Sequence, residues 1–174
     1  MRHLHMLYGN LHLRINEAKS AVASAYRRDF LGFGPWSAPG RKVRLRVAAK
    51  ALKRMRDRVR EITSRTRGRS MIAVAEELRR YLLGWRGYYG SVHTNRVLLR
   101  QDEWIRRRLR AIHLKQWKRG RTVFRELRAR GASKRVAAEV AGHTKRWWRT
   151  SRGVIHHVLN IPYFDQMGIP HLDE

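Results

Sequence analysis

DEWIRRRLRAIHLKQWKRGR, residues 102–121, combines an apolar helical stripe with a dense run of cations. Four apolar side chains, one of them just upstream, recur at the spacing of a single helix face: Leu98, Ile105, Leu109 and Ile112. The pattern predicts one long helix that begins near Thr94 or Asn95 and reaches Trp117. Such a stripe needs other helices to cover it.

The cations of this stretch are not balanced by nearby acids. Eight of them fall within sixteen residues: Arg106, Arg107, Arg108, Arg110, Lys115, Lys118, Arg119 and Arg121. No Asp or Glu lies between Trp104 and Arg125, whereas a solvated helix face usually intersperses acids at i,i+4. The run would span ~24 Å of helix, which matches several phosphates of an RNA groove. We therefore expect most of these side chains to face outward, towards RNA.

Helical patterns also flank this stretch. Before it, residues 48–68 carry an apolar stripe and end at Gly68, and Ser70 is a candidate N-cap for a helix from Met71 to about Leu83. After it, the sequence predicts a helix from Thr122 to Arg130 that ends at Gly131.

The last part of the chain is predicted to be helical as well. Ser133 should cap a helix that stops at Gly142. A final helix is expected near 151–160, where Pro162 prevents its continuation.

The amino-terminal part has a different pattern. Residues 4–15 alternate loosely, which favours a strand, and residues 29–36 and 41–47 predict two strands around a Gly/Pro-rich turn at 34–40. A lone hairpin is marginal in water, so it must lean on another surface. The predicted fold class is mainly α, a helical bundle preceded by a short β-hairpin.

Composition narrows the classes of function. The 174 residues hold 40 Lys and Arg against 13 Asp and Glu, a formal net charge of +27. Because such a charge opposes a compact chain, a polyanion is the expected partner, and nucleic acid is the usual one. With no cysteine, disulfides and thiolate metal sites are excluded, and we expect neither a metal site nor a cofactor. No apolar run approaches the ~20 residues of a membrane span, so a cytoplasmic protein without membrane contact is expected.

Three segments resemble a known family. YLLGWRGYYG (81–90), the stretch 102–121 and RTSRGVIHHVLNIPYFDQMGIPHL (149–172) are similar, in order and spacing, to the C-terminal part of group II intron-encoded reverse transcriptase/maturases. Upstream, LHLRINEAKSAV (11–22) and RRDFLGFGPW (27–36) resemble the closing strands of the palm of that family. VREITSRTRGRS at 59–70 resembles the start of its thumb.

The resemblance implies two domains: a palm-like β remnant at 1–47 and a helical thumb and maturase (X) domain at 48–174. In that family the thumb follows the template–primer duplex, and the maturase region grips the intron RNA so that it reaches its splicing fold. The match also places Lys19 near the primer end. The function implied is an RNA-binding maturase-type module for structured group II intron RNA.

Polymerase activity needs aspartates that this sequence lacks. The family holds two Mg²⁺ ions with a YxDD turn and a third aspartate, and none of the five aspartates here is adjacent to another: Asp29, Asp57, Asp102, Asp165 and Asp173. We therefore expect no enzyme activity of the chain alone.

The basic stripes and one aromatic residue make up the predicted RNA-contacting set. Its members are Arg54, Arg56, Arg58, Arg60, Arg106, Arg107, Arg108, Arg110, Lys115, Lys118, Arg119, Arg121, Lys145, Arg146, Trp148 and Arg149. Replacing Arg106, Arg107 and Arg110 together by Ala is expected to weaken RNA binding without unfolding the protein.

Three alternatives remain. The chain could be the C-terminal piece of a split reverse transcriptase, active only with a separate chain that supplies the aspartates and docks on residues 7–47. Residues 131–149 could form a helix-turn-helix that binds double-stranded DNA. The sequence could also be a degenerate remnant without function.

Overall fold

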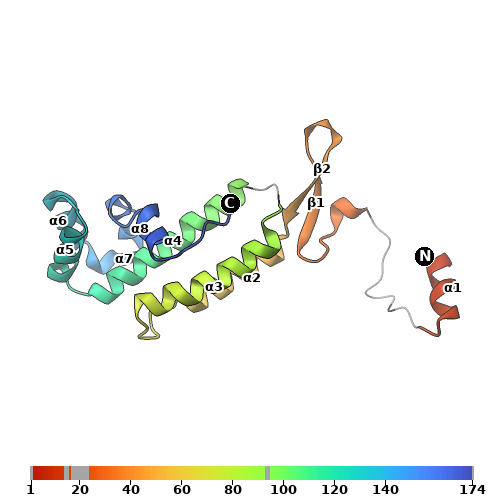
Figure 1. The fold of residues 1–174 in the computed structure, drawn as a ribbon, viewed down its shortest axis with the longest axis horizontal. Helices are drawn as coiled ribbons and strands as arrows, with labels where there is room; N and C mark the ends of the chain where they lie inside the picture. Colours follow the sequence, from red (N-terminus) through yellow and green to blue (C-terminus); the bar gives the residue numbers. More distant parts are fainter. Residues whose placement is uncertain (1, 14–15, 17–23, 93–94, 174) are drawn as a thin grey trace. The chain divides into compact units, whose positions relative to one another are not determined.

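The computed structural model describes residues 2–13, 16, 24–92 and 95–173 (Figure 1). The chain divides into two compact units, Met1–Ala48 and Ala49–Glu174. This boundary lies one residue from the predicted one, and the identity of the first unit as a palm remnant stays a prediction. As expected, the fold is mainly helical, with a two-stranded hairpin ahead of the helices of the second unit.

The predicted hairpin is confirmed. Strand β1 (Phe33–Ser37) pairs antiparallel with β2 (Val43–Val47), so that Phe33 lies opposite Val47. A Cβ atom at Gly34 would come within 3 Å of the Asp29 carboxylate and the Arg46 guanidinium, so a larger residue would have to displace this ion pair.

The strand predicted over residues 4–15 is wrong for its first part, which forms helix α1 (Arg2–Asn10). The segment is rich in Leu and Met, which lose little rotamer freedom in a helix, and it contains no β-branched residue before Ile15. Local propensity therefore outweighs a loose alternation. Residues 14–15 and 17–23 lie outside the described part of the chain, and with them the role predicted for Lys19.

Helices α2 (Ala49–Ile62) and α3 (Met71–Tyr89) pack against each other. The Ser70 hydroxyl accepts a hydrogen bond from Ala73 N at 3.2 Å, which confirms the predicted N-cap. Helix α3 continues well beyond Leu83, through two exposed glycines, because buried Leu82 and Trp85 hold that part of it in the core.

Helix α4 (Asn95–Trp117) is the predicted long helix, and its apolar stripe is buried as expected: Leu98, Ile105, Leu109 and Ile112. It contacts α2, where Arg56 Nε donates to Gln101 Oε1 at 2.7 Å. The predicted caps, Thr94 and the side chain of Asn95, lie outside what the structure describes.

The remaining helices cover the C-terminal half of α4. Helix α5 (Gly120–Ala129) ends at Gly131, whose φ of 83° and following hydrogen bond from Ala132 N to Leu127 O form a Schellman motif. Helix α6 (Lys134–Gly142) begins at Ser133, which accepts from Val136 N at 3.2 Å. Both predictions are confirmed.

The prediction for the last segment is partly wrong. Instead of one helix at 151–160, the chain forms the one-turn helix α7 (Trp147–Thr150), a 3-10 turn (Val154–His157) and helix α8 (Ile161–Gln166). Pro162 opens α8, since the first turn of a helix needs no N–H at that position.

Candidate nucleic-acid interface

Three arginines of the α4 run donate hydrogen bonds to backbone carbonyls at the ends of other helices. Arg110 donates from Nε to Ser151 O at 2.9 Å and from Nη1 to Leu159 O at 3.1 Å. Arg107 Nη2 donates to Trp148 O at 3.0 Å. These carbonyls lie in or just after α7 and the following 3-10 turn, where a helix leaves acceptors unpaired and a cation is favourable.

Arg108 does the same for the end of α2. Its Nε donates to Thr63 Oγ1 at 2.6 Å, and Nη2 lies 3.4 Å from the carbonyl oxygens of Arg60 and Thr63.

Arg110 remains a cation despite its partly buried position. Burial lowers the pKa of Arg110 to about 10, with Arg106 and Arg107 adding to the effect, so the guanidinium stays charged at neutral pH.

Arg106 is the clearest correction to the predicted set, because its side chain is only 4% exposed. Its Nη1 lies 3.6 Å from Asp102 Oδ1, and its Nη2 lies 3.4 Å from Asp165 Oδ1 and 3.2 Å from His171 Nε2. A buried cation between two carboxylates cannot reach a phosphate. From the contacts of Arg106, Arg107 and Arg110 we now expect that removing all three together destabilises the fold.

The α2 stripe is partly neutralised. Arg58 pairs with Glu61 at 2.6 Å and Glu77 at 3.0 Å, and Arg60 pairs with Asp57 at 2.6 Å. Arg56, which is bonded to Gln101, and Arg54 are exposed and form no ion pair within the residues that the structure describes. Exposed pairs are worth little, so Arg58 and Arg60 remain accessible to an anion.

Beyond α2, the exposed cations of the predicted set gather at two places. The first, here called the α4–α5 corner, surrounds the break between these helices and consists of Lys115, Lys118, Arg119 and Arg121. The second, the α7 patch, consists of Lys145, Arg146 and Arg149. Among the described residues no carboxylate pairs with any of these seven side chains. They are the strongest candidates for contact with phosphates.

Stacked guanidinium and indole groups were not predicted from the sequence. The Arg65 guanidinium lies 3.0 Å from the ring centroid of Trp147, and that of Arg107 lies 3.9 Å from the ring centroid of Trp148. The Arg107 guanidinium thus covers part of the Trp148 ring. Trp147 and Arg65, which the sequence did not single out as RNA contacts, are added to the candidate interface. The only signal in the sequence is that SRTRGR (64–69) follows a helix and contains no acid.

A buried aromatic group supports the α4–α5 corner. His113 Nε2 lies 3.1 Å from Tyr163 Oη, and its ring packs against Trp117 with centroids 5.1 Å apart. Burial, reinforced by the nearby Arg130 cation, lowers the pKa of His113 to about 4. The imidazole is therefore neutral at physiological pH and belongs to the core.

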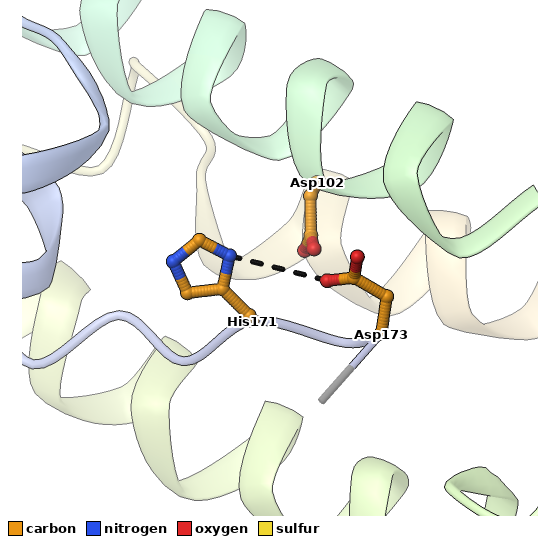
Figure 2. A group of neighbouring side chains, drawn as sticks. All are labelled: Asp102, His171 and Asp173. Atoms are coloured by element: carbon orange, nitrogen blue, oxygen red, sulfur yellow. Dashed lines mark ion pairs between the residues drawn. The ribbon is translucent and has the colours of Figure 1, made fainter. Parts of the chain in front are cut away.

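Asp102, His171 and Asp173 bring ligand-type atoms within 4.8 Å of one another, as Figure 2 shows. This cluster was not predicted from the sequence, because Asp102 lies about seventy residues before His171 and Asp173. Arg106 already supplies positive charge to Asp102 and His171, and the buried Leu172 N–H donates to Asp102 Oδ2 at 3.0 Å. Burial raises the pKa of Asp102, while the Leu172 N–H and Arg106 oppose that shift. The cluster is explained by the packing of the C-terminal segment against α4.

The helix-turn-helix alternative is not supported by the geometry of residues 131–149. Helix α6 is followed by a 3-10 turn and by α7, which has only four residues. A recognition helix must be long enough to present several side chains to the major groove. Within the described residues, no helix is long and apolar enough to cross a membrane.

Comparison with protein families gives one finding. Residues 52–131 match the family model described as "Group II intron, maturase-specific domain". The match runs from α2 through α5 and includes the α4–α5 corner, whereas the α7 patch lies beyond it. A search of curated proteins finds no match.

Proposed function

We propose that the chain binds structured group II intron RNA and promotes its splicing, because residues 52–131 match the model of the group II intron maturase-specific domain. The observation that carries this proposal is the α4–α5 corner: four exposed cations inside the matched region with no carboxylate partner among the described residues. Pairing within the protein cannot remove the net charge of +27, so RNA phosphates are the natural counter-charge.

The inward-facing arginines support this function indirectly. Arg107, Arg108 and Arg110 fix the ends of α2 and α7 against α4, so the exposed cations stand on a rigid frame. A rigid surface loses less conformational entropy when it binds. The protein would then favour one folded arrangement of the RNA, and the RNA itself would carry out the splicing chemistry.

The test is splicing of a group II intron RNA with and without the purified chain. The proposal expects tight binding and faster intron excision. An RNA of equal length that cannot form the intron fold serves as competitor and should bind more weakly. Equal binding of both RNAs together with unchanged excision would refute the proposal.

We further propose that the chain has no polymerase activity of its own, since its sequence lacks the paired aspartates of the family. Incubation with Mg²⁺, dNTPs and a primed template should give no extension. Extension by the pure chain would overturn this part.

A second candidate is the C-terminal piece of a split reverse transcriptase. One observation favours it: the first unit exposes apolar side chains on and beside its hairpin, with Phe30 75% and Val43 62% exposed. Such side chains suit a docking edge for a second chain that brings the catalytic aspartates. Primer extension that appears only when both chains are mixed would favour this function over the first.

A further inference from the structure

A pocket of about 260 Å³ lies where the end of α2 meets α4 and α7. Its lining includes three arginines, one buried hydroxyl and two indoles: Arg60, Thr63, Arg65, Arg108, Trp147 and Trp148. Its volume is below the ~300–1,000 Å³ usual for drug-sized ligands, so it suits a phosphate with part of one nucleoside better than a whole dinucleotide.

The pocket concentrates positive charge without matching acids. Arg60 pairs with Asp57, but neither Arg65 nor Arg108 pairs with a carboxylate within the described residues. Burial lowers the pKa of Arg108, and the neighbouring Arg60 and Arg65 cations lower it further. Three guanidiniums held together repel one another, and an anion bound between them would relieve that repulsion.

The arginines are already oriented by the protein. Thr63, which is 1% exposed, donates its hydroxyl to Val59 O and accepts from Arg108 Nε, so the Arg108 fork has a fixed direction. The Arg65 guanidinium carbon lies 3.0 Å from the ring centroid of Trp147. Guanidinium planes and indole rings both stack on nucleobases, and the edge of the Arg65 guanidinium can bind phosphate oxygens with two hydrogen bonds. Arg108, whose Nε and Nη2 already donate to Thr63 and to backbone carbonyls, contributes mainly its charge.

We infer that this pocket binds one nucleotide of the RNA, with its phosphate between Arg65 and Arg108 and its base against the Arg65–Trp147 pair. This inference rests on the proposed function and adds to it a defined contact. The RNA segment concerned must be single-stranded, because a base in a helix is not free to stack on a side chain. A bulge or loop of the intron meets that requirement.

The experiment uses the full chain and a group II intron RNA in which uridines of single-stranded segments are replaced by 4-thiouridine. Irradiation followed by mass spectrometry is expected to place a crosslink on Trp147 or Trp148. The variant Arg65→Gln should lose this crosslink and bind the RNA ~10-fold or more weakly, as expected for a lost charge-assisted hydrogen bond. Arg135→Gln, an exposed position on α6, removes the same charge elsewhere and should change affinity less than ~3-fold.

A second variant separates charge from shape. Arg65→Lys keeps the cation but loses the flat fork, so it should retain the salt dependence of the wild type and lose most of the crosslink. Thermal melting of each variant shows whether it is folded. If the Arg65→Gln variant does not fold, the Arg65→Lys variant serves as the test.

Three outcomes would overturn the inference. The first is an Arg65→Gln variant that binds like Arg135→Gln, and the second is crosslinks that map outside the pocket. The third is loss of the crosslink when inorganic phosphate alone is added at millimolar concentration, which would assign the pocket to a free small anion. If the wild type binds no intron RNA, the proposed function fails first; if it binds and only the pocket variants are normal, the pocket inference alone fails.

Discussion

Replacing Arg110 by Ala should destabilise the protein instead of acting on RNA binding directly. The guanidinium donates to Ser151 O at 2.9 Å and Leu159 O at 3.1 Å, so the change leaves two carbonyls without their charged partner. Hydrogen bonds to charged groups contribute ~1.5–3 kcal/mol each, and water can reach part of this site. We expect a loss of roughly 2–4 kcal/mol in the free energy of unfolding, which corresponds to a fall in Tm of roughly 5–15 °C for a chain of this size.

The assay is urea and thermal unfolding followed by circular dichroism, with RNA affinity measured on the same samples at a temperature where both proteins are folded. Arg121→Ala is the matched control, since that arginine is exposed at the α4–α5 corner. It should change stability by less than ~0.5 kcal/mol and weaken RNA binding. An Arg110→Ala variant that melts like the wild type and loses RNA affinity would refute the assignment and restore the outward-facing arrangement expected from the sequence.

Further predictions concern local features of the fold. The pKa of His113 is about 4 in the folded protein and 6.5 in the unfolded chain, because burial disfavours the charged imidazole. The stability that the neutral, buried imidazole contributes is therefore complete above pH 6.5 and is lost as the pH falls towards 4, where the unfolded chain binds a proton more readily. The loss is about 3 kcal/mol at most, and a His113→Phe variant should show a shallower fall in urea midpoint between pH 6.5 and 4. Ser133→Ala removes the N-cap of α6 and should cost ~1 kcal/mol by thermal melting, whereas an equal effect of Ser133→Asn would argue against capping. Gly131→Ala forces a side chain into a φ of 83° and should cost ~1 kcal/mol; an unchanged Tm would show that the turn relaxes freely.

Features encoded by neighbouring residues were predictable from the sequence. The spacing of Leu98, Ile105 and Leu109 predicted the buried face of α4, and Ser70 and Ser133 predicted two helix starts, because each of these signals is local. The family match over 52–131 agrees with the resemblance noted in the sequence.

The direction of each arginine was not predictable. Arg107 and Arg110 reach carbonyls more than forty residues away, and a backbone carbonyl leaves no trace in the identity of its residue. The absence of acids near these arginines suggested a free cationic face, but backbone oxygens took the place of carboxylates. The stacking of Arg65 on Trp147 depends in the same way on where the chain returns.

On the proposed function, the exposed cations of the α4–α5 corner and the α7 patch neutralise RNA phosphates. The most direct test is the affinity of the full chain for a group II intron RNA across a series of salt concentrations. If each of the seven side chains displaces one counterion, the logarithm of the binding constant should fall against the logarithm of salt concentration with a slope of roughly −6. A slope flatter than about −1 would contradict the account.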